Sequence, residues 1–213
     1  MKTERLIDML ATDGSVADHP APSRRFGIAV LGGIAAAVVL MALGLGIRPD
    51  IGTVVHTAMF WIRVGFAVTM LGTALLAATR LARPGVTAAP GLAAIAMPVA
   101  LIWCLAAFVL VRAPEGSRLA LLLGHTWRVC PPLIAALAVP AFVAMFWAMR
   151  GMAPVRLRLA GAVAGLAAGA AAVIAYCLHC PEMAPPFWAL WYLSGMLIPA
   201  VAGSLLGPRF LRW

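Results

Sequence analysis

Apolar residues along this chain gather into six blocks separated by short polar segments. Each block holds about 20 residues, the length that an α-helix needs to cross a hydrocarbon core ~30 Å thick. We therefore predict an all-α polytopic membrane protein with six transmembrane helices. The predicted spans cover residues 26–47, 57–79, 90–111, 131–150, 159–178 and 187–206.

Polar segments at both ends of the chain set the expected domain limits. We expect residues 1–25 to form a short cytoplasmic tail, residues 26–206 the six-span transmembrane domain, and residues 207–213 a cytoplasmic C-terminal tail. The first apolar run begins only near Phe26 and is long enough to span a bilayer, so we expect it to remain as a helix and not to be a signal peptide. An even number of spans places both tails on one side of the membrane.

The distribution of positive charge favours a cytoplasmic N-terminus. Hydrophobic residues make up 64% of the chain and charged residues 11%, and the net charge is +9. On this topology the inner segments carry eleven Lys and Arg residues and the outer segments four, in agreement with the positive-inside rule. The arginines therefore set the orientation and contact anionic lipid headgroups, and we expect no direct binding of nucleic acid.

The remaining basic residue, Arg63, falls inside a predicted span. It lies about two helical turns from the outer end of the second span, where an unpaired charge is costly. We expect its side chain to snorkel outward or to pair with Asp50 or Glu115.

The N-terminal tail contains a short amphipathic segment. Leu6, Ile7 and Leu10 lie at helical spacing after Thr3, whose side chain can cap a helix. A segment of this length cannot build its own core, and a helix this short orders only on contact with a membrane or a partner. An amphipathic helix of this kind can bind in the groove of a partner protein.

Chemically reactive side chains gather where the fifth span ends. Cys177, His179, Cys180 and Glu182 lie within six residues, and Cys130 opens the fourth span. Both ends belong to the predicted outer side, where disulfides persist in bacteria. Consecutive spans are commonly neighbours, so the sulfurs of Cys130 and Cys180 can come within bridging range, although the sequence alone does not place their Cα atoms within the ~7 Å that a disulfide requires.

Local position predicts that these two thiols differ in reactivity. Cys130 lies at a helix N-terminus, two residues after Arg128, and both features favour a thiolate. Cys180 follows a helix C-terminus, where the helix dipole opposes a thiolate. We therefore predict that Cys130 attacks and Cys180 resolves.

Other roles for the cysteines stay open on this reasoning. Cys177 and Cys180 form a C-x-x-C pattern that could hold a soft metal ion together with His125 or His56, so any metal-binding residues are unknown. Cys177 can instead face lipid or a neighbouring helix, as Cys104 does, and be inert. A membrane thiol oxidoreductase that passes electrons to a quinone would use the same thiols, and a scaffold without switching chemistry is a further alternative.

Several enzyme and cofactor classes are disfavoured. All four histidines fall outside the apolar spans, which argues against a transmembrane haem protein. The chain has no phosphate-binding glycine loop and no nucleophile elbow. We therefore expect a protein that is not an enzyme and has no cofactor.

Small and aromatic residues predict how the spans pack. Gly161, Gly165 and Gly169 recur every four residues on the fifth span, and this spacing lets another helix approach closely. Near span ends, aromatic side chains are expected to settle at headgroup depth as anchors. These expected anchors are Trp188, Trp191, Tyr192 and Trp213.

Four segments of the chain together resemble the NrsF family. They are the opening residues 1–8, the Cys130-Pro131 start of the fourth span, the glycine-rich helix that leads into residues 176–182, and the ending, residues 206–213. The resemblance covers essentially the whole chain. Members are six-span bacterial inner-membrane proteins that act as negative regulators of an extracytoplasmic-function sigma factor.

This resemblance implies a membrane anti-sigma factor whose termini are both cytoplasmic. Its partners would be the lipid bilayer and a sigma factor, which the tail would bind through Leu6, Ile7, Asp8 and Leu10. Cys130 and Cys180 would be the sensing thiols that respond to metal or oxidative stress and release the sigma factor. The auxiliary residues expected beside them are Cys177, His179, Glu182 and Arg128.

Overall fold

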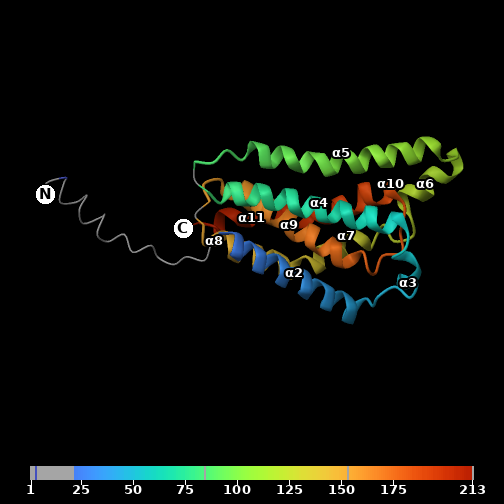
Figure 1. Cartoon of the computed structure of the whole chain (residues 1–213), viewed down its shortest axis with the longest axis horizontal. Helices are drawn as coiled ribbons and strands as arrows, with labels where there is room; N and C mark the ends of the chain where they lie inside the picture. Colours follow the sequence, from blue (N-terminus) through green and yellow to red (C-terminus); the bar gives the residue numbers. More distant parts are fainter. Residues whose placement is uncertain (1–2, 4–21, 84, 153, 213) are drawn as a thin grey trace.

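The computed structural model of this protein describes residues 3, 22–83, 85–152 and 154–212, and these residues form helices and turns without a β-strand (Figure 1). The all-α architecture predicted from the apolar blocks is confirmed. The expected binding residues of the tail, Leu6, Ile7, Asp8 and Leu10, lie outside the described residues.

Long helices run along the bundle and short helices lie in the connections. The long helices are α2 (Pro22–Gly44), α4 (Ala58–Leu81), α5 (Ala89–Arg112), α9 (Leu157–Tyr176) and α11 (Leu193–Phe210). The shorter helices α7 (Cys130–Leu137) and α8 (Val139–Arg150) follow one another directly. The connections contain α3 (Ile51–Val54), α6 (Glu115–Leu123) and α10 (Pro185–Phe187), and a π-helical turn, η1 (Trp188–Tyr192), leads into α11.

Five helices of the described chain are long and apolar enough to cross a membrane, and α7 and α8 supply a sixth span if they are taken together. Their axes differ by 45°, so the predicted fourth span is a broken helix and not a straight one. Pro140, in the first turn of α8, accounts for the break because its nitrogen cannot donate a hydrogen bond to the preceding turn.

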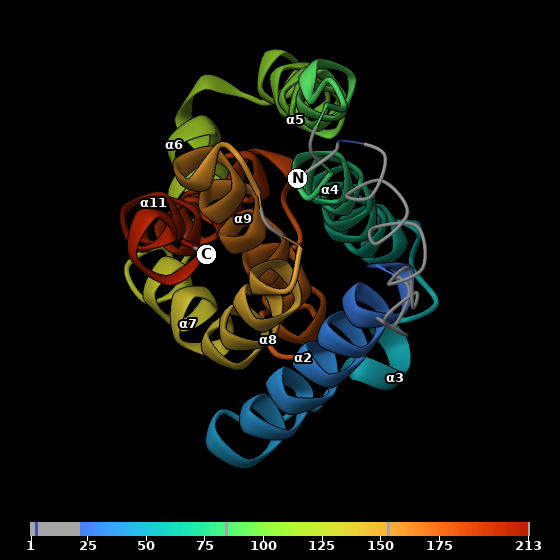
Figure 2. The same ribbon diagram turned by 90° about the vertical axis from the view of Figure 1, so that its left-hand side faces the viewer.

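Helix α9 occupies the centre of the bundle. In the view along the bundle, α2, α4, α8 and α11 surround it (Figure 2). Alanine and glycine make up most of α9, and its small side chains let these neighbours approach closely. Helix α5 lies at the periphery, where it packs mainly on α4 and α10. The buried centre of the molecule is therefore one helix of small residues that runs from end to end.

The predicted glycine packing face on α9 is confirmed. A Cβ atom at Gly161 would collide with the carbonyl group of Gly203, and one at Gly165 would collide with that of Pro199. A Cβ atom at Gly169 would lie 2.8 Å from the Cα atom of Met196. All three partners belong to α11, so α9 and α11 form the tightest helix pair of the bundle.

The expectation that aromatic residues anchor the protein at headgroup depth is wrong for Trp188 and Tyr192. Both side chains are fully buried. Trp188 donates from its indole N–H to the carbonyl oxygen of Glu182 at 3.0 Å. Trp191 is partly buried and donates to the carbonyl oxygen of Leu122 at 2.8 Å. Proximity to a span end does not distinguish a lipid-facing ring from one that fills the space beneath a loop.

The two ends of the bundle differ in what they carry (Figure 1). The thiol end is formed by α3, α6, α10 and the loop 177–184. The arginine end is formed by the start of α2, the ends of α4, α8 and α11, and the start of α9. The start of α2 and the end of α11 lie together at the arginine end, as an even number of crossings requires.

Candidate functional site

The candidate site is built on the loop that follows α9. After Tyr176 the chain makes one more tight turn, in which the Tyr176 carbonyl oxygen accepts hydrogen bonds at 3.0 Å from the backbone N–H groups of His179 and Cys180. Pro181 follows and cannot continue the helix. This turn places Cys180 inside the thiol end and not on its surface.

The structure places Cys130 and Cys180 near one another, which the sequence allowed but did not establish. Both side chains are fully buried and both are free thiols, and they lie close enough for Cys130 to lower the pKa of Cys180. The rings of Tyr176 and Tyr192 lie beside them, with centroids 5.9 Å apart. The result is a buried pair of thiols enclosed by two phenol rings.

The surroundings of Cys180 counteract the unfavourable helix dipole that was expected at this position. The pKa of Cys180 is lowered, first by the hydrogen bond from the Cys130 thiol and further by Tyr192, the backbone N–H of Glu182 and the charge of Arg63. Arg128, which was expected to activate Cys130, is exposed and lies over the Trp127 ring at 4.9 Å. These contacts favour a thiolate at Cys180, and the order in which Cys130 attacks and Cys180 resolves stays a prediction.

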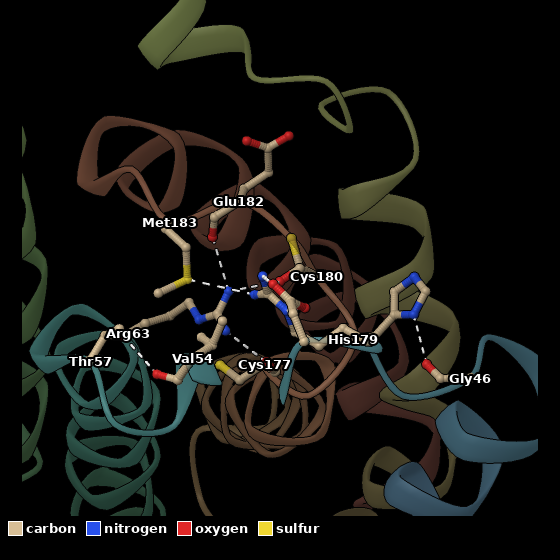
Figure 3. Close-up of polar contacts among 11 residues, drawn as sticks. Gly46, Val54, Thr57, Arg63, Cys177, His179, Cys180, Glu182 and Met183 are labelled. Carbon is tan, nitrogen blue, oxygen red and sulfur yellow. Dashed lines mark hydrogen bonds and ion pairs between the residues drawn. The ribbon is translucent and has the colours of Figure 1, made fainter. Parts of the chain in front are cut away.

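Arg63 donates hydrogen bonds to the thiol loop. It has partners within the bundle, but these are not the expected carboxylates, and the side chain does not snorkel to the surface. Its side chain is fully buried. It donates to the carbonyl oxygens of Cys177 at 2.7 Å, Cys180 at 3.0 Å and Glu182 at 2.9 Å. Figure 3 shows the guanidinium group pointing into this loop. The cation faces the C-terminal end of α9, where the helix dipole is negative, and this favours its burial.

The carboxylates expected to pair with Arg63 have other partners. Asp50 accepts two hydrogen bonds of 2.7 Å from Arg48, and Glu115 lies 3.7 Å from Arg118. Arg48 also donates to the Cys180 carbonyl oxygen at 3.0 Å. The hydrogen bond from Arg48 holds the pKa of Asp50 below its usual range. Arg48, which the sequence analysis did not identify, is thus a second arginine that donates to the same loop.

His179 joins the thiol loop to the chain that follows α2. Its Nδ1 atom lies 2.9 Å from the carbonyl oxygen of Gly46, and a carbonyl can only accept, so Nδ1 carries the proton. The backbone N–H of Arg48 donates to the Leu178 carbonyl oxygen at 3.1 Å. The connection between α2 and α3 is therefore bound to the thiol loop through side chain and backbone.

Glu182 joins the thiol loop to the start of α7. Its carboxylate accepts hydrogen bonds from the backbone N–H groups of His125 at 2.6 Å and Thr126 at 3.2 Å. Gly124, with a φ of +55°, fits here because a Cβ atom would lie 2.7 Å from the Glu182 carboxylate. The Thr126 carbonyl oxygen in turn accepts from the Cys130 backbone N–H at 2.9 Å. Glu182 therefore positions the turn from which Cys130 emerges.

The other two cysteines are separate from this pair. Cys177 is fully buried, which agrees with the alternative that it packs inside the protein and excludes the alternative that it faces lipid, and burial raises the pKa of its thiol to about 12. Cys104 on α5 is exposed. Across the described ranges, no group of three or more His, Cys, Asp and Glu side chains has the arrangement of a metal site. His125 and His56 do not complete one with the C-x-x-C pattern.

Sequence reasoning missed Arg48, Tyr176, Tyr192 and Trp188 as parts of the site. Arg48 and Asp50 flank a proline in the short connection after α2, and this pattern is typical of an ordinary polar loop. The aromatic residues lie next to span ends, where an anchor is the usual interpretation. The sequence did contain one indication of these partners. Arg63 is a charged residue inside a predicted span, and such a residue requires partners within the bundle.

Comparison with known proteins assigns the chain to a family. The family described as "NrsF: Negative regulator of sigma F" matches residues 10–213. A probable anti-sigma-F factor NrsF from Azospira oryzae is 46% identical over 213 residues, and the anti-sigma-F factor NrsF of Caulobacter vibrioides is 38% identical over 216 residues, with 100% of each chain covered in both cases. No solved structure matches the chain. These relatives are regulatory proteins and not enzymes, and this chain belongs to the NrsF family of negative regulators of sigma F.

Proposed function

We propose that this chain, an anti-sigma-F factor, holds a sigma factor of the extracytoplasmic-function class at the bacterial inner membrane and releases it when the chemistry of Cys130 and Cys180 changes. The observation that carries the proposal is the pair of buried, neighbouring free thiols at one end of the bundle. Two thiols in contact respond to two kinds of signal, oxidation and soft metal ions.

Either signal changes the bonding within the pair. An oxidant that accepts two electrons converts the two S–H groups into one S–S bond and releases two protons. A soft metal ion displaces the two protons and binds both thiolates. In each case the distance between the two sulfurs changes. Cys130 opens α7 and Cys180 follows α9, so the relative position of these helices changes with it.

The network around Cys180 supports transmission beyond the thiols. Hydrogen bonds from Arg63 connect the loop to α4, and one from Arg48 connects it to the chain after α2. The Glu182 carboxylate accepts a hydrogen bond from the turn before α7. A displacement of the loop therefore acts on helices whose other ends lie at the arginine end. Packed helices respond to such displacements by moving between discrete arrangements.

We place sigma-factor binding at the arginine end. Helix α2 begins at this end with Pro22, inside the predicted tail of residues 1–25, and Leu6, Ile7, Asp8 and Leu10 of that tail are the proposed binding residues. The inner loops 80–87 and 150–158 would add positive contacts. The excess of basic residues at this end supports a cytoplasmic orientation for both termini. With the thiols on the outer side and the binding residues on the inner side, the protein would transmit a signal across the inner membrane.

Replacing the two thiols tests the proposal. We expect Cys130→Ser with Cys180→Ser to keep repression of sigma-dependent transcription but to abolish its induction by a soft metal or an oxidant. Cys177→Ser is the matched control, because Cys177 is equally buried and lies in the same loop, and it should retain induction. A double variant that is induced like the unmodified protein would contradict sensing by this pair.

A further inference from the structure

Positive charge at the arginine end has no acidic counterpart within the described ranges. Nine arginines lie at this end, whereas the three described acidic residues, Asp50, Glu115 and Glu182, all belong to the thiol end. The nine are Arg24, Arg25, Arg80, Arg83, Arg150, Arg156, Arg158, Arg209 and Arg212. Such an excess attracts anions from outside the chain.

Three of these arginines line one cavity. The cavity has a volume of about 400 Å³ and lies between the turn that follows α4 and the residues that precede α9. Arg80, Arg83 and Arg156 contribute to its wall. Gly85, with a φ of +81°, bends the chain around it. The site is therefore concave and cationic, and its three arginines share one cavity.

The Arg80 guanidinium group in this cavity is poorly satisfied by the protein. Arg80 donates to the Thr87 carbonyl oxygen only at 3.5 Å. Its Nε atom is buried and has no hydrogen-bond partner among the described residues. A buried donor without a partner is costly, and an anion in the cavity would remove that cost.

The position and lining of the cavity indicate the chemical class of the anion. It lies where two membrane-spanning helices end, at the level of lipid headgroups. Its rim includes the exposed apolar residues Val86 and Val155, which suit the glycerol and acyl portion of a lipid. Guanidinium groups match phosphate oxygens in charge and geometry, and basic pockets between helices on the cytoplasmic side bind anionic headgroups.

We propose that the cavity lined by Arg80, Arg83 and Arg156 binds the phosphate of an anionic phospholipid. This inference does not depend on thiol sensing or on the class of sigma factor. A bound headgroup would bridge the α4–α5 turn and the start of α9, and would fix the separation of these two helices at the proposed cytoplasmic face.

Lipid binding to the purified full-length protein tests this site. We would exchange the protein into mild detergent, titrate it with phosphatidylglycerol or phosphatidylcholine, and measure retained lipid by native mass spectrometry. We expect preference for phosphatidylglycerol, and a loss of at least about tenfold in its apparent affinity when Arg80, Arg83 and Arg156 are all replaced by Gln, because the phosphate then loses its charged donors.

A matched control separates a site from general attraction. Replacing Arg24, Arg158 and Arg212 by Gln removes the same charge from the same end, at exposed positions outside the cavity. We expect this control to change the affinity less than about threefold, because a scattered surface charge is screened by salt. Equal losses in the two triple variants would overturn the proposal.

The remaining outcomes are also decisive. Arg83→Gln alone, at an exposed position, should fold normally and still lower the affinity several-fold; an unchanged affinity would contradict the proposal. Inorganic phosphate that stabilises the protein as well as the lipid does would identify free phosphate as the ligand and overturn lipid binding. Displacement of the lipid by a peptide of residues 1–23 would reassign the cavity to an acidic protein segment.

Discussion

Arginine serves different purposes at the two ends of this molecule. At the thiol end, Arg48 and Arg63 are buried and donate to backbone carbonyl oxygens of the loop 177–184. At the arginine end, Arg24, Arg83 and Arg156 are exposed and have no acidic partner within the described residues. The comparison teaches that the first group holds the fold together, whereas the second is available for lipids and partners.

The largest expected effect is the loss of Arg63. Replacing it by Met leaves the carbonyl groups of Cys177, Cys180 and Glu182 without their donors, which we expect to cost about 4 kcal/mol of unfolding free energy. Denaturant unfolding in mixed micelles measures this value. Alkylation of Cys180 should become faster as the loop opens.

Arg112→Met is the control for this prediction, since Arg112 is an exposed arginine at the same end that lies over Phe108. We expect it to cost less than about 0.5 kcal/mol. Similar values for the two variants would remove the distinction between structural and available arginines.

The next effect concerns the helix pair that connects the two ends. In Gly165→Ala the added Cβ atom meets the carbonyl group of Pro199, and backbone cannot yield as a side chain does. We expect a cost of about 2 kcal/mol. Gly72→Ala on α4 is the control, because nothing lies within 4 Å of its Cβ position, and thermal unfolding of both should separate them. If Gly165→Ala is as stable as Gly72→Ala, α9 and α11 do not form a rigid connection.

A smaller effect is expected at Glu182. In Glu182→Gln the shape is kept but the charge that strengthens the hydrogen bonds from His125 and Thr126 is lost, at a cost of about 1 kcal/mol. Because this turn precedes Cys130, we expect faster alkylation of Cys130. Glu115→Gln, at a carboxylate that is 91% exposed, should leave the rate unchanged. An unaltered rate in Glu182→Gln would show that the carboxylate does not position Cys130.

The smallest effect is that of Asp50. Its pKa is lowered by the hydrogen bond from Arg48, so its contribution to stability is present above the unfolded-state pKa and is lost as the pH falls through the folded-state value. Asp50→Asn should therefore melt slightly lower than the unmodified protein at neutral pH. The two melting curves should converge in acid. A difference that persists or grows in acid would contradict the assigned ion pair.

The spans and the glycine contacts could be predicted from the sequence because both depend on local properties. The length of an apolar block determines whether a helix can cross the membrane. Glycines that recur every four residues lie on one face of that helix, where another helix can pack closely. The bend at Ala138 was not predicted, although Pro140 lies in the middle of the predicted span and can kink a helix. A proline alone does not decide the outcome, because Pro98 and Pro199 lie inside α5 and α11, which continue through them.

The site could be predicted only in part. The topology brought Cys130 and Cys180 to one end, but the environment of each sulfur depends on side chains from distant segments. Arg63 reaches the thiol loop only because of how α4 packs against α9, and this contact could not be predicted from the position of either residue in the sequence. The burial of Trp188 and Tyr192 also depends on packing between distant segments, because both rings fill space inside the bundle beneath a loop.

Co-purification from the native membrane tests the central claim most directly. We would tag the C-terminus, solubilise the protein in mild detergent, and identify what co-purifies with the full chain and with a chain that lacks residues 1–23. The account predicts a sigma factor that binds the full chain and is lost when these residues are removed. A sigma factor that remains bound without the tail, or no sigma factor on the full chain, would contradict it.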